Sequence, residues 1–279
     1  NAALSSSFSL TLRTGMDPSD KFPVIPDNAL LDSVQKRTFR YFWDYGHPVS
    51  GLARDKTNTS ETDDCSIGGT GFGLLCLPVA VSRNFISHAE GLARMQKVVG
   101  FLKTRAQTFH GAFPHRMNGT TGSVIVWQPK DDGADLVETS FLMMGLLTAR
   151  QFFNGTDVQE TALRNEINSL YHNVDWNWFK KDSQNALYWL WSPTNTWDIT
   201  FMIRGWNEAL ITYVMAASSP THSISKEVYD NGFANHGGFR NGQPYYGLSL
   251  PLGTAFGGPL FLSQFSFLCI KPKGLNDAY

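Results

Sequence analysis

Two helix-length segments of this chain are apolar on almost every side. They read GGTGFGLLCLPVAVSR over residues 68–83 and ADLVETSFLMMGLLTARQFF over residues 134–153. A helix that is apolar all round has to be covered by other elements of the fold. Half-polar helices can cover it and keep one face in water. The two segments therefore predict an all-α protein with buried inner helices and outer helices that have one wet face.

Several further segments show the pattern of an amphipathic helix, with apolar side chains at three- and four-residue steps. Strand signals are sparse, with an exception at LYWLW, residues 187–191. Residues 1–26 are predicted to be an extended leader, because SSSFSLTLR alternates and three prolines follow it. The further helices are predicted over residues 27–45, from an N-cap at Asp27, 87–102, from an N-cap at Ser87, 157–172, 199–217 and 251–268.

Helix pairs of this kind can close into a toroid that leaves a cleft at one end. A complete (α/α)6 toroid needs six such pairs, which is more than the predicted helices provide. Residues 27–279 are therefore expected to form an incomplete toroid whose C-terminal part is missing. Apolar surface is expected to be exposed where that part would pack.

Composition excludes several classes of function. A net charge of -1 with 17% charged residues gives no footprint for nucleic acid or an anionic membrane. No apolar stretch reaches the length of a membrane span. The cysteines and histidines lack metal-binding spacings, so we expect neither a metal nor a cofactor. The glycines of GGTGFG do not have the spacing of a nucleotide-binding loop, and they favour close helix packing instead.

The strongest local feature is the acidic segment PKDDGADLVETSF. Asp131 and Asp132 precede the predicted helix, and Asp135 and Glu138 lie three residues apart on one face of its first turns. Acidic side chains at the start of a helix often only cap it and interact favourably with its dipole. That explanation fits Asp131 or Asp132, but it fits Glu138 poorly, because apolar residues follow on every side. A carboxylate entering a buried helix needs a partner or a function.

A second candidate lies in WSPTNTWDITFMIRGWNEALITYV, residues 191–214. Arg204 and Glu208 are four residues apart in the predicted helix, so an ion pair within the helix is an alternative to a catalytic role for Glu208. Three tryptophans, Trp191, Trp197 and Trp206, cluster in this segment. Tryptophans are more often core residues than sugar platforms, although Trp197 is predicted to lie in a loop.

Carboxylates from two helices with aromatic rings between them suit glycoside hydrolysis. That reaction needs one carboxylic acid to protonate the leaving oxygen and one carboxylate to activate water or attack. Different degrees of burial separate the two pKa values and so assign the roles. The long loop over residues 111–133 carries Phe113, His115 and Trp127, and loops of this length in compact domains are usually functional.

Long motifs of the chain resemble the glucoamylase-like family that contains bacterial endo-β-1,2-glucanases, glycoside hydrolase family 144. The resemblance covers residues 28–279 in order and includes HGAFPHRMNG, YWLWSPTNTW, IRGWNEALITYVMAASSPTH and LPLGTAFGGPLF, besides the two apolar segments. It implies an (α/α)6 toroid, export by a bacterium to the periplasm or the outside, and endo-acting, inverting cleavage of β-1,2-glucan. The functional acids of the family fall on Asp131, Asp135, Glu138 and Glu208.

We therefore expect a monomeric glycoside hydrolase with Glu208 as general acid. Asp135 or Glu138 is expected to bind sugar hydroxyls or to act as base, unless the base lies beyond residue 279. Two alternatives stay open: a carbohydrate-binding protein without catalysis, and a polysaccharide lyase, which the acid-rich cleft disfavours. The expected substrate-binding residues are Asp131, Asp132, His115, Phe113, Trp127, Trp191, Trp197, Arg204 and Trp206.

Overall fold

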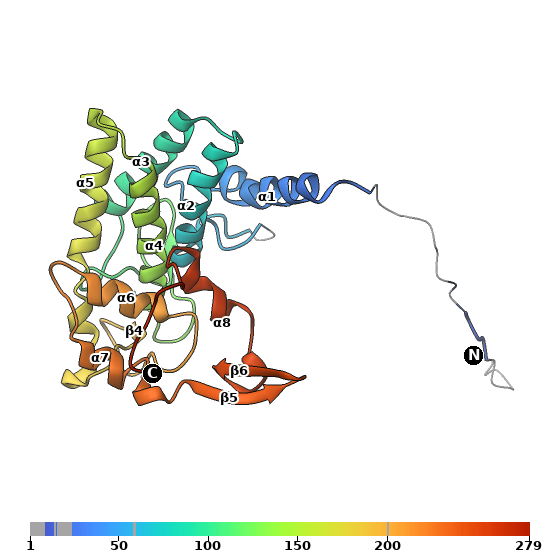
Figure 1. The fold of residues 1–279 in the computed structure, drawn as a ribbon. Coiled ribbons are helices and arrows are strands. Elements are labelled where there is room, and N and C mark those ends of the chain that lie inside the picture. Colours follow the sequence, from blue (N-terminus) through green and yellow to red (C-terminus); the bar gives the residue numbers. More distant parts are fainter. Residues whose placement is uncertain (1–8, 14, 16–23, 58–59, 200) are drawn as a thin grey trace, which may run out of the picture. The chain divides into compact units, whose positions relative to one another are not determined.

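The computed structural model describes residues 9–13, 15, 24–57, 60–199 and 201–279 (Figure 1). Most of the predicted leader lies outside these residues, and its described part has no helix or strand. Two compact units, residues 1–35 and 36–279, are each described by themselves. Helix α1 (Asp27–Asp44) begins in the first unit and ends in the second, which confirms the predicted helix, although Asp27 is its first residue and not its N-cap.

Long helices form the centre of the second unit, where α2 packs on α4, α4 on α5, and α3 on both α2 and α5 (Figure 1). The shorter helix α6 packs on α4. The apolar segments of the sequence are α2 and α4, which confirms their predicted place inside the fold. The helix bounds are α2 (Ile67–Ser82), α3 (His88–Thr104), α4 (Leu136–Phe152), α5 (Val158–Asn173) and α6 (Leu210–Ser218).

Helices α2 and α4 approach until their backbones touch. A Cβ atom added to Gly71 would lie 2.0 Å from the carbonyl oxygen of Phe141, and one added to Gly145 would lie 2.2 Å from the carbonyl oxygen of Gly71. Only glycine fits at such a crossing, so these two residues set the distance between the helices. The close packing predicted from GGTGFG is confirmed.

Helices α2, α3, α4 and α5 each begin at a side chain that accepts hydrogen bonds from their first free N–H groups. Ser87 Oγ accepts from Glu90 N (3.2 Å), and Glu90 returns the contact by accepting from Ser87 N (2.7 Å), as in a capping box. The N-cap predicted at Ser87 is thus confirmed. Asp135 at the start of α4 and Asp157 at the start of α5 each accept hydrogen bonds from two N–H groups of the first turn.

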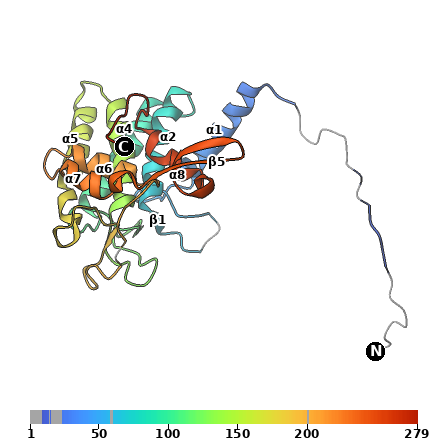
Figure 2. The ribbon, with the colours of Figure 1, turned by 60° about the horizontal axis from the view of Figure 1, so that its bottom comes forward.

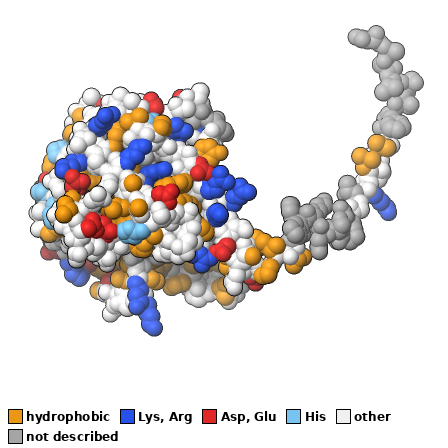
Figure 3. Space-filling view, turned by 90° about the horizontal axis from the view of Figure 1, so that it is seen from above, with side chains coloured by type: hydrophobic (Ala, Val, Ile, Leu, Met, Phe, Trp, Pro, Cys, Tyr) orange, Lys and Arg blue, Asp and Glu red, His pale blue; other side chains and the backbone are white. Residues whose placement is uncertain are grey.

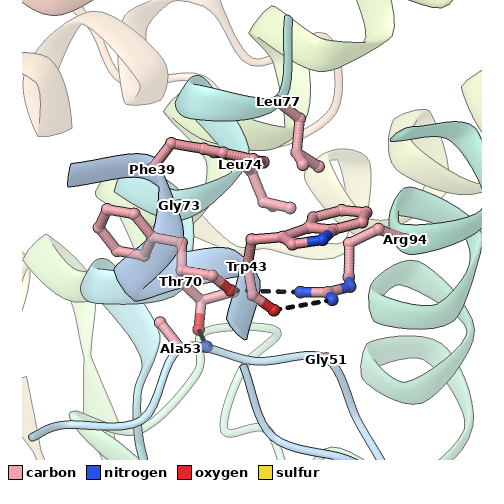
Figure 4. Close-up of a pocket in the computed structure, with 10 residues that line it drawn as sticks. Phe39, Trp43, Gly51, Ala53, Thr70, Gly73, Leu74, Leu77 and Arg94 are labelled. Atoms are coloured by element: carbon pink, nitrogen blue, oxygen red, sulfur yellow. Dashed lines mark hydrogen bonds between the residues drawn. The ribbon is translucent and has the colours of Figure 1, made fainter. Parts of the chain in front are cut away.

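Arg94 of α3 holds the C-terminal end of α1 within the second unit. Its guanidinium donates to the carbonyl oxygens of Phe42 (3.2 Å) and Trp43 (3.1 Å) and lies 4.2 Å from the centroid of the Trp43 ring (Figure 4). These carbonyls lack partners inside the helix, so a cation there is favourable. The pocket beside them measures about 20 Å³, which is room for a water molecule and not for a sugar.

Short strand pairs lead into the starts of the two buried helices. β1 pairs with β2 directly before α2, and β3 pairs with β4 directly before α4. Figure 2 brings the bottom of Figure 1 forward, and with it β1 and the loops around it. The strand expected in LYWLW is confirmed as β4. The bounds are β1 (Asp64–Ser66), β2 (Arg116–Asn118), β3 (Ala134–Asp135), β4 (Leu190–Trp191), β5 (Arg240–Tyr245) and β6 (Leu248–Leu252).

The C-terminal third of the chain departs from the prediction. The helix expected over residues 199–217 begins only at Leu210, because Gly205 has φ +83°, a left-handed conformation that ends helical structure. The helix expected over 251–268 is replaced by β6 and short turns, since Gly253 and Gly257 have φ +90° and +85°. The further elements are α7 (Lys226–Asn231), α8 (Phe261–Gln264) and 3-10 turns at Trp176–Phe179, Lys181–Ser183, Asn235–Gly237, Ala255–Gly257 and Phe265–Leu268.

The second unit is thus mostly helical with small strand pairs, and closure into an (α/α)6 toroid stays a prediction. Figure 3 shows acidic, basic and apolar side chains interspersed over one face. No helix among the described residues is long and apolar enough to cross a membrane. Large apolar side chains are exposed along the C-terminal segment, namely Tyr246, Leu248, Phe256, Leu260, Leu268 and Leu275.

Candidate active site

Asp135 is held in place by four hydrogen bonds to its carboxylate. It is fully buried and forms the N-cap of α4, where Oδ1 accepts from the N–H groups of Val137 (3.0 Å) and Glu138 (2.9 Å). Its other oxygen, Oδ2, accepts from His115 Nδ1 (2.9 Å) and Trp189 Nε1 (3.2 Å). Four donors occupy this carboxylate, so Asp135 positions its neighbours and has little capacity left for a sugar hydroxyl or a water molecule.

Glu138 connects the first turns of the two buried helices. Its Oε2 accepts from the N–H of Gly68 in α2 (2.7 Å). A Cβ at residue 68 would lie 2.5 Å from that oxygen, so glycine is needed for this approach. Burial and the negative charge of Asp135 raise the pKa of Glu138 to about 7, against the lowering effects of His115 and Gly68. The Glu138 carboxyl can therefore gain or lose a proton near neutral pH.

Asp131 is a second buried carboxyl in this cluster, with only 3% of its surface exposed. No described residue donates a hydrogen bond to its Oδ2 atom. Burial and the charge of Asp135 raise the pKa of Asp131 to about 6. A buried carboxylate oxygen without a protein donor is free to accept from a ligand.

The Asp131→Asn variant is expected to be more stable than the wild type at pH 8. A folded-state pKa raised from 3.8 to about 6 means that the ionised form is disfavoured in the fold, so stability is lost as pH rises through that range. Removing the charge should recover about 3 kcal/mol at pH 8 and almost nothing near pH 4. The charged groups facing Asp131 are Asp132, Asp135, His115 and Arg116.

Urea unfolding of both proteins at pH 4 and pH 8 measures this difference. An equal effect at the two pH values, or a loss of stability at pH 8, would show that the Asp131 carboxylate is well solvated in the fold.

His115 joins the carboxylates to an exposed aromatic ring. Burial alone lowers the pKa of His115, but the hydrogen bond and charge of Asp135, together with Glu138, outweigh burial and raise the pKa to about 9. The imidazole is therefore cationic at neutral pH. It stacks on Trp127, with centroids 4.7 Å apart and planes inclined by 12°. Half of the Trp127 surface is exposed, so this indole can receive a ligand.

Asp132 fixes the loop that follows β4. Its carboxylate accepts hydrogen bonds from the hydroxyls of Ser192 and Thr194. Partial burial raises the pKa of Asp132, but these hydrogen bonds outweigh it and the net shift is downward. Asp132 stays ionised and supports the loop at the edge of the cluster.

Three of the predicted sugar-binding rings pack against protein side chains. Phe113 is 1% exposed and lies in the core, so its ring has no surface to offer a sugar, which corrects its predicted role. Trp197 stacks on Trp178 (5.2 Å), and Trp191 meets the same ring edge-on (5.1 Å). This packing is the core alternative that the sequence left open for Trp191 and Trp197.

The helix predicted through Arg204 and Glu208 does not form. Glu208 lies in a turn two residues before α6, and among the ion pairs of the described residues none joins it to Arg204. Arg204 donates to the carbonyl of Asn231 (3.2 Å) instead. Trp206 Nε1 donates to Ser263 Oγ (3.2 Å). The ion-pair alternative for Glu208 is therefore wrong.

Two groups of the site, the Trp189 side chain and the Gly68 N–H, were not predicted from the sequence. Trp189 donates to Asp135, and the N–H of Gly68 holds Glu138. Trp189 lay in the expected strand LYWLW, where alternation with Leu190 could have indicated a ring directed toward α4. A backbone N–H donor has no signal in a sequence. Within the described residues, no group of three or more histidine, cysteine, aspartate or glutamate side chains could hold a metal ion.

Buried carboxyls beside an exposed indole are the kind of site that enzymes acting on carbohydrates use. Comparisons with known proteins point the same way. Residues 200–279 match the glycoamylase family model, described as "Putative glucoamylase". The endo-β-1,2-glucanase of Chitinophaga pinensis, solved with sophorotriose and glucose, is 42% identical with a TM-score of 0.87, over 92% of this chain and 63% of that one.

Two proteins of Parabacteroides distasonis are also similar. A solved β-1,2-glucanase is 40% identical with a TM-score of 0.87, over 92% of this chain and 39% of that one. An exo-β-1,2-glucooligosaccharide sophorohydrolase is 41% identical over 91% of this chain and 37% of its own length. The chain thus spans less than two thirds of each relative. The resemblance to the glucoamylase-like family that contains β-1,2-glucanases is confirmed.

Proposed function

We propose that the protein hydrolyses β-1,2-linked glucan and that this chain carries its acidic site. The observation that carries the proposal is the cluster at the start of α4. There, two buried carboxyls with pKa values raised to about 6 and 7 lie beside a cationic His115 and the exposed Trp127. Support also comes from the relatives, which are named for action on β-1,2-glucan or its oligosaccharides.

Glu138 is the group that we assign to take a proton from water or from a substrate hydroxyl. Its pKa of about 7 lets it be ionised at neutral pH and still bind the proton it removes. Asp135 is a positioning residue, because its four hydrogen bonds orient His115 and the first turn of α4. Inversion requires the base to act through water, with the two carboxyls about 6.5–9.5 Å apart.

Glu208 is the group that we assign to protonate the glycosidic oxygen. It comes from a separate segment that precedes α6, and α6 is joined to α4 by a hydrogen bond between Ser140 and Thr212 (2.7 Å). A donor outside the α4 cluster is needed, since Asp135 and Glu138 start the same helix and cannot lie on both sides of the bond. The reaction is proposed to be endo-acting and inverting, by a monomer that is exported to the periplasm or the outside of the cell.

Incubation of the full-length protein with linear glucans of defined linkage tests the proposed function. We expect products from β-1,2-glucan and none from β-1,3- or β-1,4-glucan, followed by chromatography. An endo mode gives a ladder of oligosaccharides at early times, whereas an exo mode gives a single short product from the start. Binding without products would support a carbohydrate-binding protein, and an unsaturated product would indicate a lyase.

A further inference from the structure

A polar groove of about 500 Å³ lies next to the acidic cluster. It is lined by residues 60–64, 116, 118 and 125–127, and we refer to it as the Trp127 groove. Its volume falls within the range of about 300–1,000 Å³ that small-molecule sites occupy. The roles assigned above to the acidic residues leave this groove unused.

The β1–β2 pair lines the groove with Asp64, Arg116 and Asn118, and Asp64 lies opposite Asn118 in the register. Arg116 donates a hydrogen bond to Asp64 (2.8 Å) and forms an ion pair with Asp55 (3.2 Å). Asp64 is 5% exposed, and its Oδ1 has no hydrogen-bond partner among the described residues. Arg116 Nε is unpartnered in the same sense. Buried polar atoms of this kind normally have hydrogen-bond partners. The Asp64 oxygen can therefore accept from a ligand, and the Arg116 nitrogen can donate to one.

The Trp127 groove and the acidic cluster are connected at two places. Trp127 lines the groove and stacks on His115, which in turn binds Asp135. On the other side, β1 continues without a break into α2, whose Gly68 N–H holds Glu138. The groove and the acidic cluster are therefore neighbours, linked by the Trp127–His115 contact and by the junction of β1 with α2.

We propose that the Trp127 groove binds glucosyl units that flank the cleaved linkage. Trp127 is the stacking platform, and Asp64, Arg116 and Asn118 bind sugar hydroxyls. The inference rests on the proposed function. Acidic side chains outnumber the single guanidinium along the lining, which favours a neutral sugar over an anionic one. Substrates long enough to fill the groove gain binding energy that the shortest substrates do not.

The Trp127→Ala variant of the full-length protein tests this assignment on β-1,2-glucooligosaccharides of increasing length. We expect kcat/KM to fall about 30-fold on the longer substrates, the loss that follows truncation of an anchoring tryptophan. The shortest hydrolysed substrate should change less than threefold, and Trp127→Phe should keep most of the activity. Tyr246→Ala serves as the control, because Tyr246 is 94% exposed on the β5–β6 turn.

An equal loss on every substrate length would overturn the assignment, because Trp127 would then act only by placing His115. So would an unchanged profile in a variant whose thermal unfolding matches the wild type. If the wild type cleaves no β-1,2-glucan, the proposed function fails, and calorimetric binding of the same oligosaccharides still tests the groove. Tighter binding with length in the wild type and not in Trp127→Ala supports it, and equal binding by both proteins contradicts it.

Discussion

Glu138→Gln and Glu208→Gln are each expected to lower turnover on β-1,2-glucan by about 10²–10⁴-fold, with substrate binding largely retained. Glutamine keeps the shape of the side chain but cannot exchange a proton. At residue 138 the amide oxygen can still accept from the N–H of Gly68, so the contact between α2 and α4 is preserved. The loss should therefore appear in kcat and leave the fold intact.

The pH dependence of kcat/KM distinguishes the role of Glu138 from a structural one. Its pKa is raised to about 7, and a base works only when it is ionised. Activity of the wild type should therefore fall as pH drops below about 7. In Glu138→Gln the residual activity should lose this acidic limb. An acidic limb that is unchanged in the variant would remove Glu138 from the role of base.

Glu227→Gln is the matched control for both variants, because Glu227 is exposed in the first turn of α7. Its turnover should stay within about twofold of the wild type, as for a surface substitution. Wild-type turnover of Glu208→Gln on unactivated glucan would remove Glu208 from the mechanism.

Gly145→Ala is expected to destabilise the folded protein by about 3 kcal/mol or more. The added methyl group would lie 2.2 Å from the carbonyl oxygen of Gly71, and the nearest atoms all belong to the backbone of α2. Backbone cannot move aside as a flexible side chain can, so the two helices have to separate. Separation would also disturb the Glu138–Gly68 contact at the start of the same helices, so activity should fall together with stability.

Gly100→Ala is the control, since an added Cβ on this residue of α3 meets no atom within 4 Å. Alanine is favoured over glycine within a helix by about 0.5–1 kcal/mol, so this variant should be slightly more stable than the wild type. Free energies of unfolding in urea compare the three proteins. Equal stability of Gly145→Ala and the wild type would show that α2 and α4 are not in backbone contact.

Hydrophobic pattern alone predicted the centre of the fold. A stretch such as residues 134–153 is too apolar for any place but the inside, and α4 lies there. The N-cap at Ser87 was also predictable, because capping is a local property of a few neighbouring residues. The C-terminal third was not. Its apolar residues have helical spacing, but glycines at 205, 253 and 257 take left-handed conformations that depend on tertiary contacts.

The acidic site was predictable in its residue types and only partly in its geometry. Asp135 and Glu138 were expected to share a helix face, and both start α4. Their partners are distant in sequence, since Glu138 binds the backbone of Gly68 and Asp135 binds Trp189. These contacts turned Asp135 from an expected catalytic group into a positioning residue. Burial of Phe113 likewise follows from packing that no local pattern shows.

A crystal structure of full-length Glu138→Gln with a bound β-1,2-glucooligosaccharide tests the central claim most directly. The account predicts a sugar ring on Trp127 and a glycosidic oxygen within hydrogen-bond distance of the Glu208 carboxyl. The anomeric carbon should face residue 138 with space for one water molecule between them. An oligosaccharide bound away from the start of α4, with neither residue 138 nor Glu208 near a glycosidic bond, would contradict it.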